Sequence, residues 1–193
     1  MAKRYAIANG NWSNPATWDG GASLPGVGDD VYADGKAVII DINVTVKNIY
    51  TMQRSGGTLG GTFTANTSVV ITCTGIDGIK SATLNTAGGA LIIAANSPDA
   101  VTVNAIIQQH NNAYSNQTIK HTGSADVVIN GEIRGSHIYA RGLYSTGTGT
   151  ITINGNLIAG NTTGATAIEI AGAANLYITG ILTPGNGANG NSN

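Results

Sequence analysis

A chain of 193 residues fits one domain, and a hydrophobic share of 41% is enough for a core. Only 10% of the residues are charged, the net charge is −1 and the nine basic residues are scattered, which excludes a basic nucleic-acid-binding or membrane-binding patch. Glycine, threonine, asparagine, valine and isoleucine are abundant, so the composition favours strands and turns over helices.

The N-terminus has two basic residues, Lys3 and Arg4, but no apolar run after them. It therefore does not have the pattern of a signal peptide, and no run approaches the roughly 18 apolar residues of a membrane-spanning helix. We expect the chain to be made and left in the cytoplasm, or to leave it by a route other than a signal peptide. The single cysteine, Cys73, excludes an intrachain disulfide framework and a cysteine zinc site.

Residues 1–35 contain both tryptophans, Trp12 and Trp18, within seven positions. Two roles fit this spacing. Either the rings cover the apolar end of the first coil of a β-solenoid, or they form a pair on which a sugar ring stacks. We favour the first role, an N-terminal aromatic cap, because a solenoid must hide its open end.

Residues 36–183 repeat a short apolar-x-apolar stretch every 24 to 30 residues. This period, with several short strands in each repeat, predicts an all-β fold, a right-handed parallel β-helix (β-solenoid) of about six coils. A propeller blade needs about 40 residues and fits less well. The inward anchors, expected to stack coil on coil, are Val46, Cys73, Val103, Ile129, Ile153 and Ile178.

Two further files of positions recur with the anchors. Apolar residues stand fourteen positions before Ile107, Ile133, Leu157 and Leu182, namely Ile93, Ile119, Leu143 and Ile168. Two positions after each anchor the chain must turn a corner, and glycine or asparagine tolerates the left-handed backbone there. We expect positive φ angles at Gly131, Gly155 and Gly180. The predicted corner residues are Asn48, Gly75, Gly131, Gly155 and Gly180, with Ala105 as the exception.

The residues between the inward positions should form a flat outer face. One row is predicted to hold Thr45, Thr72, Thr102, Val128, Thr152 and Tyr177. The next row is predicted to hold Thr74, Asn104, Asn130, Asn154 and Thr179. Ice-binding solenoids use ranks of threonine, and ice binding stays an alternative here, although Val128 and Tyr177 interrupt the rank. These two residues, with Tyr144, are our candidates for an interface with another protein chain.

The Gly/Asn-rich tail 184–193 has almost no apolar side chain and no core of its own. We therefore expect a neighbouring chain to hold it, in an oligomer with closed symmetry.

A search for catalytic groups finds none in a recognisable arrangement. No two carboxyl groups stack on neighbouring coils of one face, although glycosidases need such a pair. Asp29 and Asp30 are adjacent in the cap and suit a turn. His110 and His137 fall near one loop side without a third ligand, which is weak for zinc. The sequence thus predicts a protein that is not an enzyme, with no cofactor and no metal.

The stretch Gly10-Asn11-Trp12-Ser13, with Pro15, Thr17 and Trp18, opens a pattern that continues as Pro-x-x-Gly-Asp-Asp-Val to Val31 and Gly-x-x-Val-x-x-Asp to Asp41. Residues 10–50 resemble the opening of the eight-glycine β-helix domain, which begins β-helical surface and virion proteins of bacteria and tailed phages. The resemblance implies a structural virion protein of a tailed phage, a capsid decoration or head-fibre type that binds the major capsid protein. It also implies a homotrimer, because β-helical phage proteins of this kind are commonly threefold. The alternatives are a tail-spike or tail-fibre module that binds host glycan, and a bacterial adhesin.

Overall fold

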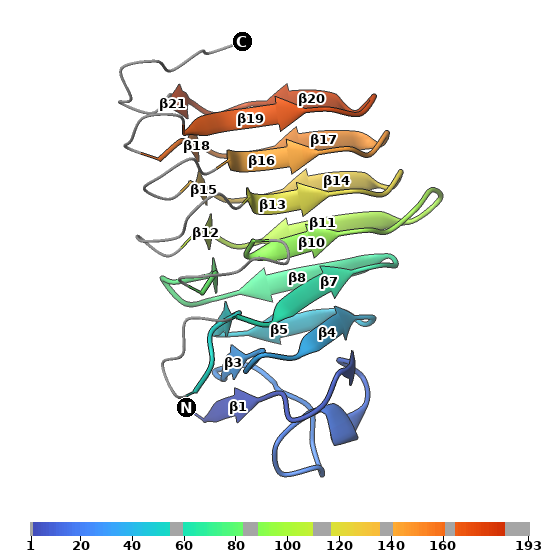
Figure 1. Cartoon of the computed structure of the whole chain (residues 1–193), viewed down its shortest axis with the longest axis vertical. Coiled ribbons are helices and arrows are strands. Elements are labelled where there is room, and N and C mark those ends of the chain that lie inside the picture. Colours follow the sequence, from blue (N-terminus) through green and yellow to red (C-terminus); the bar gives the residue numbers. More distant parts are fainter. Residues whose placement is uncertain are drawn as a thin grey trace.

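The computed structural model describes residues 2–54, 60–82, 89–109, 117–135, 141–160 and 165–183. The fold is an all-β solenoid of about six stacked parallel coils (Figure 1), as predicted. Its one described helical segment is the short 3-10 turn η1, Pro15–Thr17. Within the described residues no helix is long and apolar enough to cross a membrane. The right-handed sense of the coils stays a prediction.

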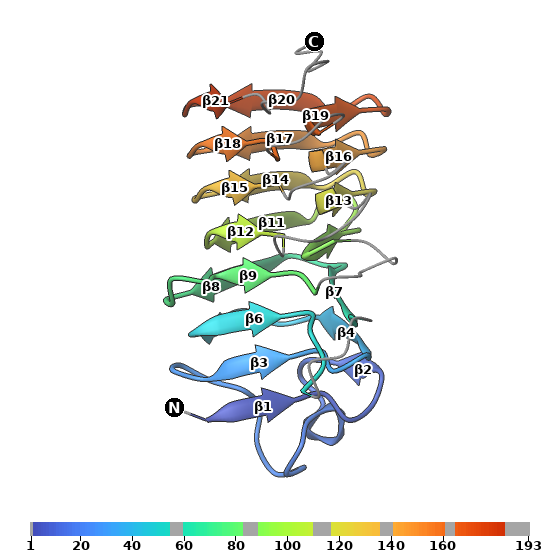
Figure 2. The same cartoon turned by 60° about the vertical axis from the view of Figure 1, so that its left-hand side comes forward.

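Each coil contributes one strand to each of three parallel sheets, which run the length of the rod (Figure 2). The eight-stranded sheet contains, in order, β1 (Lys3–Tyr5), β3 (Asp30–Tyr32), β6 (Asn48–Tyr50), β9 (Ile79–Lys80), β12 (Ile107–Gln108), β15 (Ile133–Arg134), β18 (Leu157–Ile158) and β21 (Leu182–Thr183). The seven-stranded sheet contains β2 (Gly10–Asn11), β4 (Ala37–Ile40), β7 (Thr62–Ala65), β10 (Leu91–Ile93), β13 (Gln117–His121), β16 (Arg141–Ser145) and β19 (Thr166–Ile170). The six-stranded sheet contains β5 (Val44–Val46), β8 (Val69–Cys73), β11 (Ala100–Asn104), β14 (Asp126–Ile129), β17 (Thr150–Ile153) and β20 (Asn175–Ile178).

The core follows from strand alternation. In β17 the residues Ile151 and Ile153 point inward and are buried, while Thr150 and Thr152 point outward. Of the six predicted anchors, Val46, Val103, Ile129 and Ile153 are fully buried, whereas Cys73 and Ile178 are only partly buried. Ile178 is more exposed because its coil is the last one described.

One step of the predicted stacking is wrong. Val103 lies opposite Ile71 and not opposite Cys73, so β8 and β11 are offset by two residues from the predicted register. The connection from β8 to β9 causes the offset because it is longer than its counterparts: Ile79, and not Ile76, stacks between Ile49 and Ile107. Ile76 projects into solvent with 86% of its surface exposed.

A second shift affects the file fourteen positions earlier. Leu91, and not Ile93, lies opposite Ile119 in the neighbouring coil. Ten residues separate Leu91 from Val101, whereas eight separate Ile119 from Val127, so the turn after β10 is longer. Both Leu91 and Ile93 are buried, because a shift of two residues leaves the same side of a strand facing the core.

The corner glycines do not have the predicted backbone conformation. None of Gly131, Gly155 and Gly180 has a φ between +20° and +160°. They are glycines for another reason, which is the close approach of the preceding coil. A Cβ at Gly155 would lie 2.2 Å from the carbonyl oxygen of Gly131, and one at Gly180 would lie 2.1 Å from that of Gly155. A Cβ at Gly75 would meet the side chain of Asn48.

The N-terminal segment 1–35 is not separate from the sheets. Its strands β1 and β3 pair in parallel with each other and with β6, so the eight-stranded sheet begins at Lys3. The predicted tail, 184–193, lies outside the described residues.

Candidate functional site

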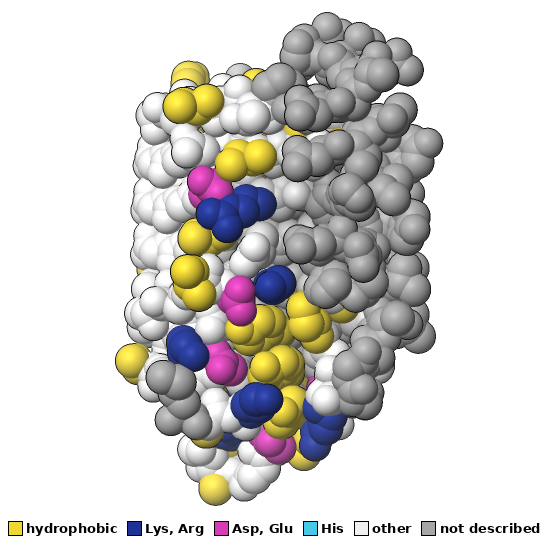
Figure 3. All heavy atoms as spheres, turned by 90° about the vertical axis from the view of Figure 1, so that its left-hand side faces the viewer, with side chains coloured by type: hydrophobic (Ala, Val, Ile, Leu, Met, Phe, Trp, Pro, Cys, Tyr) yellow, Lys and Arg dark blue, Asp and Glu magenta, His cyan; other side chains and the backbone are white. Residues whose placement is uncertain are grey.

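Aromatic and charged side chains gather on the outer face of the eight-stranded sheet, over its N-terminal half. Figure 3 shows this face, where hydrophobic, basic and acidic side chains lie close together. Tyr5, Tyr32 and Tyr50 occupy equivalent positions on β1, β3 and β6. Their ring centroids are 5.0 Å and 4.8 Å apart, and the rings are stacked. We call these three residues the tyrosine stack.

Arg54 covers the first ring of the stack. Its guanidinium carbon lies 4.4 Å from the centroid of Tyr5, within the range of a cation–π contact. Asp34 fixes this arginine by accepting hydrogen bonds from its Nε at 2.7 Å and its backbone N–H at 2.8 Å. Asp34 has a φ of 49°, a left-handed conformation that aspartate tolerates better than most residues.

Asp77 binds the other end of the stack. Its carboxylate accepts a hydrogen bond of 2.8 Å from the Tyr50 hydroxyl and lies 3.4 Å from the Lys80 ammonium group. The Tyr50 hydrogen bond and the nearby Lys80 charge lower the pKa of Asp77, although partial burial opposes them. Burial and the bond to Asp77 raise the pKa of Tyr50, and burial with the Asp30 charge raises that of Tyr32.

These pKa shifts favour particular protonation states of the patch, and those states bear on its possible chemistry. At neutral pH Asp77 is held as a carboxylate and Tyr32 and Tyr50 are held as neutral phenols. A glycosidase acid needs the opposite, a carboxyl group whose pKa is raised so that it can donate a proton. Asp30 is also held by neighbours, with Asn48 donating to it at 2.8 Å and the Lys47 ammonium group 3.7 Å away. The arrangement is that of a stabilising network.

Two of the three rings in the tyrosine stack have no open face. Tyr32 lies between Tyr5 and Tyr50, and Tyr5 lies between Tyr32 and Arg54. A sugar that binds an aromatic residue packs on the face of the ring, and both faces of these two rings are occupied. The patch therefore presents ring edges and charged groups, which suit a flat polar contact with another protein.

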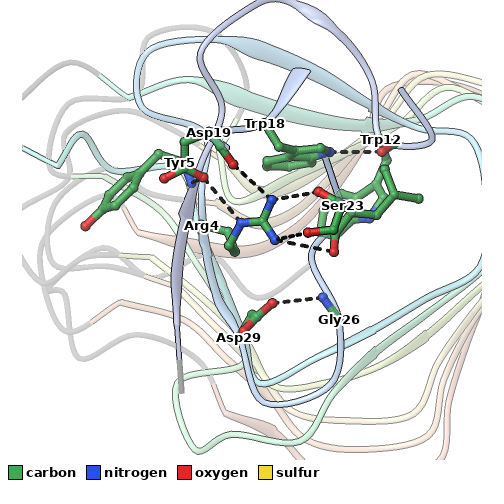
Figure 4. Close-up of polar contacts among 9 residues, drawn as sticks. Arg4, Tyr5, Trp12, Trp18, Asp19, Ser23, Gly26 and Asp29 are labelled. Atoms are coloured by element: carbon green, nitrogen blue, oxygen red, sulfur yellow. Dashed lines mark hydrogen bonds and ion pairs between the residues drawn. The ribbon is translucent and has the colours of Figure 1, made fainter. Parts of the chain in front are cut away.

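A second network of polar contacts lies in the N-terminal segment and is drawn in Figure 4. Arg4 lies opposite Val31 in a file that continues with Ile49 and Ile79, so it stands where the later coils place a core residue. Its guanidinium group donates to Asp19, Ser23 and the Leu24 carbonyl, over 2.7–3.5 Å. This bonding holds the 19–24 segment to β1.

Trp12 and Trp18 lie beside that network and are not available to a ligand. They are 1% and 0% exposed, their rings are 4.8 Å apart edge to face, and Trp18 Nε1 donates to the Trp12 carbonyl at 2.9 Å. Trp12 also packs against Phe63 of β7 at 6.0 Å. The sugar-stacking interpretation of this pair is wrong because both rings are buried. The interpretation as a cap that ends the solenoid stays a prediction.

The three predicted interface residues do not lie together. Val128 and Tyr177 are on β14 and β20 of the six-stranded sheet, two coils apart, whereas Tyr144 is on β16 of the seven-stranded sheet. Arg141 covers the Tyr144 ring at 5.0 Å and forms an ion pair with Glu169. Tyr177 is 60% exposed and Val128 is half-buried. These side chains therefore do not form one groove.

The predicted polar rows are shifted by the register of β8. Thr102 lies opposite Val70 rather than Thr72, and Asn104 lies opposite Thr72 rather than Thr74. The resulting file is a hydrogen-bonded ladder that spans five coils, with bonds of 2.8–3.3 Å from one side chain to the next. Its members are Thr72, Asn104, Asn130, Asn154 and Thr179. The ladder uses amide groups for contacts between coils, and a broken threonine rank argues against ice binding.

The histidines give no metal site in the part of the chain that is described, where no three His, Cys, Asp or Glu side chains gather. His110 and His137 lie outside that part. His121 is fully buried, and its Nδ1 lies 2.8 Å from the Ser145 hydroxyl in the next coil. Burial lowers the pKa of His121, with a smaller opposing effect from the backbone of Ala125.

Sequence reasoning missed Arg4, Arg54 and the tyrosine stack. The three tyrosines are 27 and 18 residues apart, outside a regular period, because a loop of the N-terminal segment intervenes. A usable signal was present: Tyr32 and Tyr50 each directly follow an inward aliphatic residue, Val31 or Ile49.

Comparison with known families, curated proteins and solved structures found no match for this chain. The resemblance of residues 10–50 to the eight-glycine β-helix domain therefore stays a prediction.

Proposed function

We propose that this chain is a non-enzymatic structural protein of a larger particle, a capsid decoration or head-fibre type of protein of a tailed phage. The observation that carries the proposal is the tyrosine stack with its charged flanks. The aromatic, acidic and basic side chains of this patch are bonded to one another from coil to coil. They stabilise a rigid rod and leave a flat surface of mixed charge, which is suited to docking on a protein lattice.

The patch has features of a protein-binding surface. Tyrosine and arginine are enriched in such interfaces because they combine apolar area with polar edges. Lys80 and Arg54 stand at opposite ends of the tyrosine stack, each beside a carboxylate, so the surface carries both signs of charge. The resemblance of residues 10–50 names the partner class, the major capsid protein of a tailed phage particle.

A second candidate, a tail-spike or tail-fibre module that binds glycan, is favoured by Tyr177. Its ring is 60% exposed on the outer face of β20, beside Thr152. An exposed ring next to a hydroxyl group is a chemically suitable sugar contact, but a single ring gives weak binding. The glycan function would therefore need additional contacts.

The test uses particles released by the culture that produces this protein. The chain should remain with the particles through a density gradient, detected by mass spectrometry, and purified chain should rebind to particles that have been stripped of it. Lys80→Glu, which reverses a charge in the patch, should weaken rebinding at least tenfold. Lys120→Glu, on the outer face of the seven-stranded sheet, is the matched control and should rebind normally.

Two results would contradict the proposal. One is a chain that never associates with particles. The other is release of reducing ends or unsaturated sugars from capsular polysaccharide or lipopolysaccharide at a rate well above a buffer control, which would establish an enzyme. Retained glycan binding that disappears in Tyr177→Ala, without turnover, would support the second candidate instead.

A further inference from the structure

The two ends of the rod differ in which side chains occupy the outermost core positions. At the N-terminal end Arg4 occupies the last core position and binds the 19–24 segment. At the other end the last described coil, β19 to β21, has apolar residues at its core positions. These positions are only partly buried at Ile168, Ile170, Leu176 and Ile178, and Leu182 is 45% exposed. One coil earlier, the equivalent Leu143, Ile151, Ile153 and Leu157 are at most 1% exposed.

The same coil has free strand edges on all three sides. β19, β20 and β21 are each the last strand of their sheet, and no described strand pairs with their outer edges. An apolar surface rimmed by unpaired backbone donors and acceptors is a template for another set of strands. Tyr177 and Ile181, 60% and 69% exposed, stand at its margin and add apolar area.

We infer that this end coil, residues 165–183, is a docking surface for the same end of a second copy of the chain, so that two rods join through their C-terminal coils. The inference does not depend on the proposed function, and it puts a dimer in place of the homotrimer that the resemblance implies. It rests on the charge of the surface, on the state of the opposite end and on the residues that follow in the sequence.

The low charge of the end coil limits which kind of partner can bind it. Residues 165–183 contain a single charged side chain, Glu169, which is paired with Arg141. An acidic or basic partner would find no counter-charge there. A second copy of the same surface is equally neutral and apolar. Two copies can therefore approach without electrostatic repulsion and bury their apolar surfaces against each other.

Geometry limits the mode of association. Head-to-tail stacking would place the end coil against Arg4 and its network, which offers a charged group in place of an apolar core and would make an open filament. A twofold axis across the ends instead brings one surface against its own copy and closes the assembly at two chains. Such an axis can pair one strand edge, β19 or β20, antiparallel with its own counterpart.

Residues 184–193, which follow β21 in the sequence, offer little apolar area to the end coil. Residues 184–193 are mostly glycine and asparagine, with Pro184 and Ala188 as the least polar side chains. Their composition provides no large apolar group for the surface formed by Ile168, Leu176, Ile178 and Leu182. A second copy does provide these groups.

The experiment is a measurement of mass by light scattering and sedimentation equilibrium over a range of concentrations. We expect an equilibrium between the 19.5 kDa chain and a species of twice that mass. Ile181→Glu should raise the dissociation constant at least tenfold, because it places two charges against each other at the interface. Ile76→Glu, the same change at an even more exposed isoleucine far from the end coil, should leave it unchanged.

A second measurement covers the case in which Ile181→Glu fails to fold. Hydrogen exchange of the wild-type chain should show amides of β19 and β20 gaining protection as the concentration rises, while β3 and β6 do not change. A chain that stays monomeric at every concentration, a trimer, or a dimer that tolerates a folded Ile181→Glu would each overturn the inference.

Discussion

The N-terminal and C-terminal ends of this solenoid meet the same physical problem with opposite solutions. A stack of coils ends in an apolar cross-section, and we expect Arg4, Trp12 and Trp18 of the first coils to close it. The last described coil keeps the aliphatic pattern of the repeat at its core positions up to Leu182, and these residues are only partly buried. The comparison teaches that the repeat itself carries no stop signal, and that a stop requires residues that break the repeat.

The difference extends to the outer surface. Charged side chains concentrate over the first coils, where Arg54, Asp34, Asp77 and Lys80 flank the tyrosine stack. The last coil carries only Glu169. The N-terminal half therefore presents a polar surface suited to a specific partner, while the C-terminal end presents an apolar one suited to its own copy.

The largest effect should come from truncating a buried residue at the closed end. Trp12→Ala removes a fully buried ring that contacts Trp18 and Phe63, and we expect it to lower the free energy of unfolding by about 3–5 kcal/mol. Leu176→Ala, at a partly buried position of the last coil, should cost about 1 kcal/mol in the monomer. Urea unfolding at low protein concentration measures both.

This pair of variants can break the comparison. Similar losses for Trp12→Ala and Leu176→Ala at low concentration would show that the last coil is as well packed as the first. A loss for Leu176→Ala that grows with protein concentration would instead sharpen the comparison, because it would show that a second copy buries that position.

The sequence predicted the repeat well, for a clear reason. Alternating apolar residues such as Ile151 and Ile153 report the inward side, and glycines such as Gly155 recur at the corner in most coils. The register of Cys73 against Val103 could not be predicted in the same way. A slip of two residues keeps the same side chains inside, so the pattern is satisfied by both registers. The lengths of the connecting loops decide between them.

The candidate site was harder to predict because it depends on contacts between coils of irregular length. Tyr5, Tyr32 and Tyr50 stack only because the loop between β1 and β3 returns the chain to the same sheet. Arg4 has the appearance of an ordinary N-terminal charge in the sequence. Its role at the end of the core file is visible only when β1 is paired with β3.

The next effect concerns the packing of coils near the open end. Gly155→Ala places a Cβ 2.2 Å from the Gly131 carbonyl oxygen, so the two coils must move apart, and we expect a loss of about 1–3 kcal/mol. Gly26→Ala is the matched control, since no atom lies within 4 Å of its added carbon. Thermal and urea unfolding measure the difference. If Gly155→Ala melts with the wild-type chain, the close approach of these coils is not a constraint on the fold.

A smaller effect should appear with pH in the middle of the rod. Burial lowers the pKa of His121 below its ordinary value of 6.5. As the pH drops below 6.5, His121 therefore binds a proton more readily in the unfolded chain than in the folded chain. The free energy of unfolding should fall over that range. His121→Gln should show a shallower decline between pH 7.5 and pH 5 in urea titrations, even if it is less stable throughout. Parallel declines in the two proteins would show that other groups cause the acid sensitivity.

The smallest effect is kinetic and concerns Cys73, in the coil that lies between the closed end and the middle of the rod. Burial raises the pKa of its thiol to about 12, so very little reactive thiolate is present at pH 8. The side chain packs against the core although the residue is not fully buried. We expect labelling of the native chain by a thiol reagent to be slower than labelling in denaturant by a factor of about a hundred or more.

Trp12→Ala should accelerate the labelling of Cys73, because loosening the closed end increases local opening of the neighbouring coils. Leu176→Ala should leave the rate unchanged, since the last coil is remote from β8. Fast labelling of the wild-type chain would show that the first coils open readily and that the closed end does not protect them.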